Sequence, residues 1–219
     1  MNEISPHTAA QRIVVEGFDV EVDRAEVIRL LGRSGRPAEV SARVGALLDQ
    51  MLVASRQCLV PRGVYVLAAG KDLPGSSVFS HLERMAFCVC TIGPELEAQV
   101  AELTRRDELA AAVVLDAVGS AAAEATADCL EQRIRQEAGP GLQVSCRASP
   151  GYGDWDVREQ RSIFALVPAA QIGVRLSESC MMIPRKSVSF AVHIAPQPEN
   201  LRGERSCRNC DRTKCSYRR

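Results

Sequence analysis

Residues 107–138, DELAAAVVLDAVGSAAAEATADCLEQRIRQEA, form the longest helical pattern in the chain and decide the fold. Asp107 is a candidate cap, because an aspartate side chain accepts hydrogen bonds from the first unpaired N–H groups of a helix. Small and apolar side chains step by three and four along one face, which lets neighbouring elements pack closely. They are Leu115, Val118, Ala122, Ala125 and Cys129. We expect this to be the central helix.

Segments on both sides of this helix have the composition of β-strands. Residues 13–23, 63–70 and 85–93 precede it, and residues 142–148 and 172–194 follow it. β-branched and aromatic residues are frequent in these short runs, which glycine-containing turns separate. Residues 13–23 contain a glycine near their middle and predict either one bulged strand or a short hairpin.

Shorter helices are predicted at four further places. Asp23 and Glu26 form a capping-box pattern before residues 24–32, and Pro37 is expected to start a second helix that runs to residue 57. The other two helices are predicted over residues 94–106 and 156–168. Helices and strands do not alternate regularly, which favours the α+β class over a doubly wound sheet. We predict one domain with a mixed or antiparallel twisted sheet.

Composition excludes several classes of function. The chain has 219 residues, 46% of them hydrophobic, with 27 basic and 27 acidic residues. This balance gives no reason to expect binding to nucleic acid or to a charged membrane surface. No apolar run is long enough for a membrane span and the N-terminus does not resemble a signal peptide, so we expect a cytoplasmic protein. Phosphate-binding, dinucleotide-binding and HExxH motifs are absent from the sequence.

One short stretch combines groups that suit a small charged ligand with an aromatic ring. In RASPGYGDW (147–155), Arg147 offers a planar fork for a carboxylate or phosphate. Pro150-Gly151 predicts a type II turn with exposed backbone amides, and Tyr152 and Trp155 offer aromatic faces. The alternative is a structural corner in which Arg147 forms a surface ion pair and Trp155 is buried for packing.

Three segments together resemble a known family. AEATADCLEQRIRQE (123–137), RASPGYGDW and IGVRLSESCMMIPRKSVS (172–189) are similar, in the same order, to segments of the activation domain of cobalamin-dependent methionine synthase. In that family the motifs have the form Arg-Pro-Ala-Pro-Gly-Tyr, then Leu-Thr-Glu-Ser through Pro to Ser-Val-Ser. The resemblance covers most of residues 15–193, so the chain looks like a stand-alone relative of this domain.

The resemblance implies a function without a catalytic residue of its own. It implies an accessory protein that binds S-adenosylmethionine for reductive methylation of the cob(II) form of a separate corrinoid methyltransferase, such as a split methionine synthase. Cobalamin would be carried by that partner, and a flavoprotein or ferredoxin would donate the electron. This would make the chain a component of a cobalamin-dependent methyltransferase system. The alternative is a non-catalytic corrinoid-protein partner or S-adenosylmethionine-binding module.

The family's binding residues carry over to particular positions. By resemblance, Arg147 would bind the ligand's carboxylate, and the turn that follows would contact the nucleoside. Glu124 matches an acidic position near the ligand's charged end, although a solvated helix face with i,i+4 pairs would also explain it. The implied cofactor-binding set is Arg147, Ala148, Pro150, Gly151, Tyr152, Glu124 and Glu178. The chain departs from the family at Ala148, where proline is usual, and lacks a tyrosine pair after Ser-Val-Ser.

The C-terminal segment differs in composition from the rest. We predict a domain over residues 1–195 and a basic, cysteine-rich tail or knuckle over residues 196–219. Cys207, Cys210 and Cys215 have a C-x2-C-x4-C spacing, which can supply three ligands to a zinc ion or an iron–sulfur cluster. A disordered tail with free thiols and a nucleic-acid-binding knuckle are the alternatives. The other six cysteines are expected to be small core residues.

Overall fold

The computed structural model describes residues 11–32, 41–152 and 155–201. Its centre is a five-stranded sheet with the order β1-β2-β3-β7-β4. The strands are β1 (Gln11–Glu16), β2 (Arg62–Ala68), β3 (Met85–Thr91), β7 (Ser187–Ala195) and β4 (Gln143–Val144). Every neighbouring pair is antiparallel, so the predicted α+β fold is confirmed with an antiparallel sheet.

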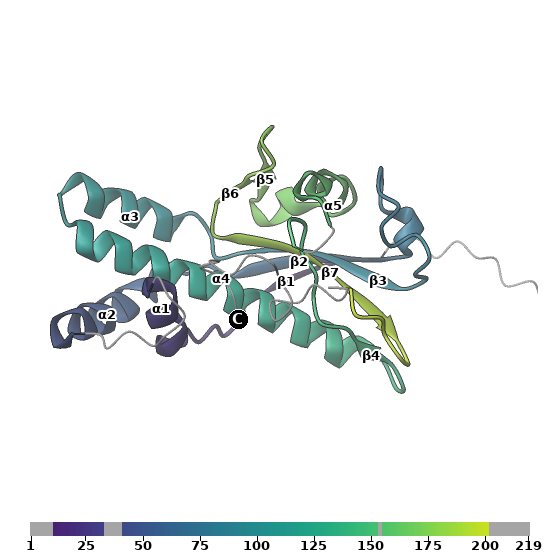
Figure 1. Cartoon of the computed structure of the whole chain (residues 1–219), viewed down its shortest axis with the longest axis horizontal. Helices are drawn as coiled ribbons and strands as arrows, with labels where there is room; N and C mark the ends of the chain where they lie inside the picture. The colour runs from purple at the N-terminus through teal and green to yellow at the C-terminus, as the bar shows by residue number, and fades with distance from the viewer. Residues whose placement is uncertain (1–10, 33–40, 153–154, 202–219) are drawn as a thin grey trace, which may run out of the picture.

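Helices cover both faces of this sheet (Figure 1). The long helix α4 (Leu109–Glu137) crosses one face and extends beyond it, where α1 (Arg24–Leu31), α2 (Ala42–Ser55) and α3 (Glu95–Arg105) pack against it. The short helix α5 (Gln160–Leu166) covers the opposite face, beside a hairpin of two short strands. These are β5 (Arg175–Leu176) and β6 (Met182–Ile183), and three 3-10 turns complete the fold, η1 (Gly70–Asp72), η2 (Val157–Glu159) and η3 (Ala169–Ile172).

The central strand β3 is buried along its whole length because both faces of the sheet are covered. Cys88 and Cys90 point toward α4, where they pack with Leu130 and other side chains of the helix. Phe87 and Val89 point the other way and pack beneath α5. The two clusters on the two faces form the core that holds α4 and α5 in place.

The buried face of α4 differs in part from the predicted one. Leu115, Val118 and Ala122 are buried as expected, but Ala125 and Cys129 are only half-buried. The first half of α4 packs against helices, whereas its second half packs against the sheet, so the contact face rotates along the helix. In the second half the buried side chains are Thr126, Ala127, Leu130 and Ile134.

Helix α4 is also the one helix in the described part of the chain that is long and apolar enough to cross a membrane. Its 18-residue apolar window is 56% buried within the protein itself. Contacts with the sheet and with three other helices account for this burial. The apolar character of α4 is therefore explained by its place in the core.

Several predicted element boundaries move. Asp23 caps α1 by accepting a hydrogen bond from the Ala25 N–H at 2.8 Å, but Glu26 pairs with Arg29 and does not close the capping box. Helix α4 starts after Glu108, because Asp107 adopts a left-handed conformation with a φ of 62°. Strand β1 ends at Glu16 and does not continue to residue 23. Helix α2 is capped by Ser41, and Pro37 lies outside the described residues.

The packed body continues past the predicted domain boundary at residue 195. Leu201 packs against the apolar cluster beneath α5. The backbone N–H of Glu199 donates a hydrogen bond to Nδ1 of His193 at 2.9 Å, and its carboxylate contacts Nε2 of His81 at 3.1 Å. Residues 196–201 therefore belong to the body, and the remainder of the predicted tail, residues 202–219, lies outside the described residues.

The two buried thiols of β3 predict a loss of stability at alkaline pH. Burial in the core raises the pKa of Cys90 to about 12 and raises the pKa of Cys88 well above its usual value. In the unfolded chain both thiols ionise near pH 8.5, roughly the value of a free cysteine, so unfolding is favoured as the pH rises above it. Each thiol should remove up to about 1.4 kcal/mol of folding free energy per pH unit in this range.

Urea denaturation under reducing conditions, at about pH 7.5 and about pH 10.5, measures this effect. The Cys88→Ala/Cys90→Ala double variant should lose less stability between the two pH values than the wild type, because it lacks both titrating groups. The comparison concerns the change with pH, so the packing cost of the two substitutions cancels. An equal decline in both proteins would contradict the prediction.

Candidate functional site

Residues 143–148, which form the edge of the sheet beside β7 and carry Arg147, contain a β-bulge. We call them the edge segment. Val144 lies opposite Ile194 in the β4–β7 pair. Ala148 lies opposite Ala191 in an isolated bridge to the same strand. Three residues of the edge segment therefore face two residues of β7, and one extra residue reverses the alternation of side chains. Accordingly, Val144 packs in the cluster beneath α4, whereas Ala148 packs in the cluster on the opposite face.

The bulge turns Arg147 toward α4. In a regular strand, Cys146 would share the face of Val144 and Arg147 would point to the other side of the sheet. Here the side chain of Arg147 lies between β7 and α4, with its guanidinium 5.9 Å from the centre of the Phe190 ring. Only 7% of the residue is exposed. A buried guanidinium needs anionic partners, and α4 supplies them.

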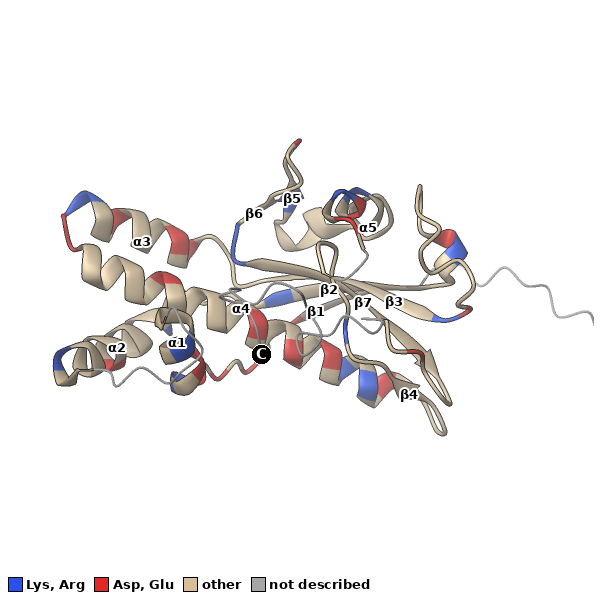
Figure 2. Cartoon of the chain, viewed as in Figure 1, with Lys and Arg blue, Asp and Glu red and all other residues tan. Residues whose placement is uncertain are grey.

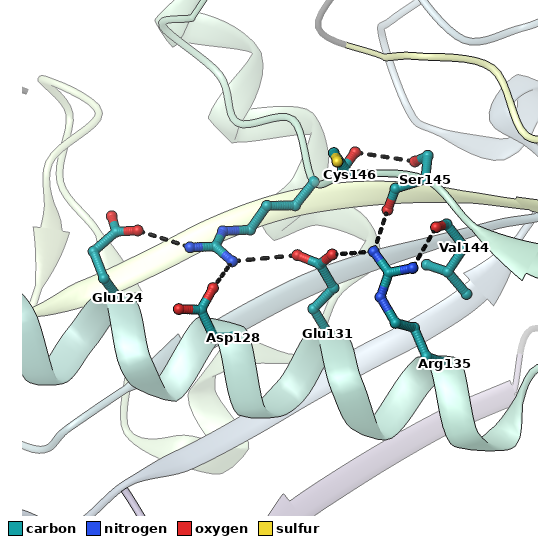
Figure 3. Close-up of polar contacts among 8 residues, drawn as sticks. Glu124, Asp128, Glu131, Arg135, Val144, Ser145 and Cys146 are labelled. Atoms are coloured by element: carbon teal, nitrogen blue, oxygen red, sulfur yellow. Dashed lines mark hydrogen bonds and ion pairs between the residues drawn. The ribbon is translucent and has the colours of Figure 1, made fainter. Parts of the chain in front are cut away.

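Three carboxylates of α4 surround the guanidinium (Figure 3). Nη2 of Arg147 lies 2.8 Å from Oε2 of Glu124, and Nη1 lies 3.2 Å from Oε2 of Glu131. Nη1 also donates a hydrogen bond to Oδ1 of Asp128. The three acidic residues are spaced four and three positions apart, which places them on one face of the helix. We call Arg147 and these three residues the arginine–carboxylate cluster.

The cluster carries an excess of negative charge. Burial alone would lower the pKa of Arg147, but the carboxylates of Asp128 and Glu124 overcome this effect and raise the pKa above its usual value. The side chains of Glu124 and Asp128 are 39% and 62% exposed, so solvent and solutes reach them. Figure 2 shows acidic residues along this part of α4, with basic residues among them only near its C-terminal end. The cluster can thus attract a cationic group while its arginine holds an anionic one.

The turn after Arg147 has the predicted form, but its amides are occupied. The N–H of Tyr152 donates to the carbonyl of Ser149 at 3.2 Å, and Gly151 has a φ of 91°, as the third residue of a type II turn requires. The N–H of Gly151 donates to the carbonyl of Trp155 at 2.7 Å. Both amides therefore stabilise the corner. The prediction that they are exposed for ligand binding is wrong. Tyr152 is 58% exposed and offers its ring beside the turn.

Trp155 has a packing role, as one of the two interpretations predicted. It is 4% exposed and meets the ring of Phe79 edge to face, with ring centres 4.8 Å apart. Its indole N–H donates to Oε2 of Glu159 at 3.1 Å. These contacts anchor the corner to the core beneath α5.

Glu178 is not brought to the arginine–carboxylate cluster. It lies in the loop between β5 and β6, and its backbone carbonyl accepts a hydrogen bond from Nη2 of Arg161 in α5 at 2.6 Å. Because α5 and α4 lie on opposite faces of the sheet, Glu178 and Glu124 lie on opposite faces too. The side chain of Glu178 is exposed.

The Ser-Val-Ser segment at the start of β7 forms structural contacts. The Ser187 hydroxyl lies 2.9 Å from Oγ1 of Thr91 and 2.7 Å from the carbonyl of Pro184. Nζ of Lys186 lies 2.8 Å from Oδ1 of Asp116. These contacts tie the start of β7 to β3 and α4, and so position the strand that runs beneath Arg147.

No group of three or more metal-ligating side chains occurs among residues 11–32, 41–152 and 155–201. The predicted ligands Cys207, Cys210 and Cys215 lie outside these ranges, so the metal prediction for the tail remains untested. The six cysteines within the described residues are all free thiols. Cys88, Cys90 and Cys180 are buried as expected, Cys58 and Cys129 are half-buried, and Cys146 is exposed.

By resemblance, Arg147 and Glu124 were each expected at the charged end of the ligand, but the sequence did not predict the ion pairs of Arg147 with Glu124, Asp128 and Glu131. The i,i+4 pairing expected on this helix face does occur between Glu131 and Arg135, at 2.5 Å. The available signal was the regular spacing of the three acidic residues. It did not suffice, because the side to which Arg147 points depends on a bulge that no local pattern in residues 142–148 predicts.

One family model and one solved structure show what this chain is similar to. The family model described as "Vitamin B12 dependent methionine synthase, activation domain" matches residues 79–202. The crystal structure of the MetH reactivation domain bound to AdoHcy is similar, with a TM-score of 0.67 and 16% sequence identity. The match covers 88% of this chain and 81% of that one. A search of curated proteins gives no significant match.

Proposed function

Because the chain belongs to the family of the vitamin B12-dependent methionine synthase activation domain, we propose that it binds S-adenosylmethionine for the reductive methylation of a corrinoid partner. The partner is a separate corrinoid-binding methyltransferase in its cob(II) form, in the simplest case a split cobalamin-dependent methionine synthase. The electron comes from a flavoprotein or a ferredoxin. All of these components act in the cytoplasm.

The arginine–carboxylate cluster is the observation that carries this proposal. S-adenosylmethionine has a carboxylate, an ammonium and a sulfonium group, so its charged end needs one cationic and at least one anionic partner. Arg147 supplies the first, and Glu124 and Asp128 supply the second. The similar reactivation domain was crystallised with AdoHcy, which has the same carboxylate and ammonium groups. That likeness supports this assignment.

Ligand binding exchanges ion pairs and does not expose a buried charge. The ligand's carboxylate takes the place of Asp128 at Nη1 of Arg147, because Asp128 is the most exposed of the three partners, at 62%. The displaced carboxylate and Glu124 then face the ammonium group. Arg147 has three anionic partners before binding and three after it, so the desolvation cost that an unpaired arginine would cause is avoided.

The remaining requirement that this chain meets in the reaction is positioning of the ligand. When bound, S-adenosylmethionine would supply the methyl group: with one electron from the donor protein, the partner's cob(II) corrinoid would become methylcobalamin, and the broken S–CH3 bond would release S-adenosylhomocysteine. No proton moves in this step, so the chain needs no general base. Its own contribution is to hold the charged end of the ligand at Arg147 and the rest of it along the turn that ends at Tyr152.

Calorimetric titration with S-adenosylmethionine tests the binding part of the proposal. We expect saturable binding with one site per chain, weakened by salt because charged groups dominate the contact. Absence of binding at millimolar ligand would overturn the proposed function. S-adenosylhomocysteine serves as the control ligand, because it has the same carboxylate and ammonium groups but no sulfonium charge.

A spectroscopic assay tests the reaction. The protein is mixed with a cob(II) corrinoid methyltransferase, a reductant and S-adenosylmethionine, and the conversion of cob(II) to methylcobalamin is followed by absorbance. We expect methylcobalamin to form only when all components are present. Binding of S-adenosylmethionine without methylcobalamin formation would overturn the reaction and leave the alternative, a non-catalytic S-adenosylmethionine-binding module.

A further inference from the structure

The bulge beside Arg147 depends on a side chain of α4 that the proposed reaction does not use. At the β4–β7 edge, the N–H of Ile194 donates to the carbonyl of Arg84, toward β3. Ile194 and Val144 therefore form a non-hydrogen-bonded pair, in which the carbonyl of Val144 points outward from the sheet. Nη1 of Arg135 lies 2.7 Å from this outward carbonyl oxygen and donates to it.

The next carbonyl of the edge segment is bound by the same arginine. In a regular ladder, the carbonyl of Ser145 would accept the N–H of His193. Here that N–H donates to the hydroxyl of Ser145 at 3.0 Å instead. The carbonyl of Ser145 is turned away and accepts from Nη2 of Arg135 at 3.2 Å. One guanidinium therefore binds two successive carbonyl groups, and this pattern holds the bulge open.

Arg135 is also linked to Arg147 through a shared carboxylate. Oε1 of Glu131 lies 2.5 Å from Nη2 of Arg135, and Oε2 lies 3.2 Å from Nη1 of Arg147 (Figure 3). The side chain of Glu131 is only 13% exposed, so its orientation is restricted. Arg135 thus acts on Arg147 by two routes, through the backbone that carries it and through the carboxylate that faces it.

We propose that Arg135 is a positioning residue that sets Arg147 for binding the ligand's carboxylate by holding the bulge at residues 145–147. This inference rests on the proposed function, because it assigns to Arg147 the contact with the carboxylate of S-adenosylmethionine. Without the bulge, the alternation of the strand turns Arg147 away from α4. Ligand affinity therefore depends on a residue that does not touch the ligand.

The test compares Arg135→Gln with Arg133→Gln. Arg133 is a matched control because it forms the same kind of i,i+4 pair, with Glu137 at 2.5 Å, and lies two positions away on the same helix. Arg135→Gln should weaken S-adenosylmethionine binding about tenfold, because it removes the charge-assisted hydrogen bonds that hold Arg147 in place but no contact with the ligand itself. Arg133→Gln should change the affinity by less than about twofold. Arg135→Lys should recover part of the loss.

Decarboxylated S-adenosylmethionine distinguishes positioning from general weakening. This ligand lacks the carboxylate that Arg147 binds, so Arg135→Gln should leave its affinity unchanged. If both ligands lose affinity equally, or if neither does, the positioning role is wrong. A lower melting temperature with unchanged affinity for S-adenosylmethionine would show a structural role only and would also overturn the proposal.

Hydrogen exchange separates this inference from the proposed function. Arg135→Gln should increase amide exchange in residues 143–148. The amides of residues 187–195 that are hydrogen-bonded to β3 should stay protected. Arg133→Gln should change the exchange of neither segment. This measurement needs no ligand, so failure of the wild type to bind S-adenosylmethionine overturns the proposed function but leaves the exchange result interpretable. Unchanged exchange in Arg135→Gln would show that Arg135 does not hold the bulge.

Discussion

Replacement of Arg147 by alanine should weaken S-adenosylmethionine binding about 100-fold, because the ligand's carboxylate loses its charge-assisted hydrogen bond to Nη1 and the cation that attracts it. It should also lower the free energy of unfolding by about 2 kcal/mol, since Glu131 stays largely buried with only one of its two arginine partners, Arg135. Glu124 and Asp128 can turn to water, which keeps the loss below that of a fully buried pair. Calorimetry and urea denaturation measure the two effects separately.

Two further variants make this prediction specific. Arg147→Lys keeps the charge but not the planar fork, so its affinity should lie between those of the wild type and Arg147→Ala. Arg161→Ala is the control. Arg161 lies on the opposite face of the sheet, where it donates a hydrogen bond to the carbonyl of Glu178 and is remote from the arginine–carboxylate cluster. Its replacement should leave the affinity unchanged. An Arg147→Ala protein that is less stable but binds the ligand normally would show that Arg147 serves only as a structural corner.

The core elements could be predicted from the sequence because their signals are local. The long helix, the two central strands β2 and β3, and the turn at Pro150-Gly151 each follow from residue type and spacing within one segment. The α+β class followed from the order of these segments. The differences from the structure lie at element ends, where a neighbour in space decides, as at Asp107, whose left-handed backbone precedes the start of the helix.

The arrangement of the candidate site could not be predicted in the same way. Arg147 faces α4 because residues 145–147 bulge against β7, and β7 lies about 45 residues further along the chain. The burial of Ala125 and Cys129 was overestimated for a related reason, since the sheet and not a helix packs against that half of α4. Glu178 belongs to a hairpin whose side of the sheet is set by α5. Each case depends on tertiary contacts that local patterns do not encode.

The second large effect concerns the loop that covers the core beneath α5. Gly70→Ala should lower the free energy of unfolding by about 3 kcal/mol or more, as severe overpacking does. A Cβ atom at residue 70 would lie 1.7 Å from the carbonyl oxygen of Phe79, and a backbone atom cannot rotate away. The loop must therefore move, and Phe79 would lose its edge-to-face contact with Trp155. Urea denaturation and near-ultraviolet circular dichroism of the tryptophan measure the result.

Gly45→Ala is the matched control for this substitution. Gly45 lies inside α2, and a Cβ atom there meets only Nη2 of Arg24, a flexible side-chain end, at 3.3 Å. Alanine should raise the stability by about 0.5 to 1 kcal/mol, because it restricts the unfolded chain and favours the helix. The same change of residue thus has opposite signs at two positions. A Gly70→Ala variant within about 1 kcal/mol of the wild type would show that the loop adapts, because overpacking that relaxes costs little.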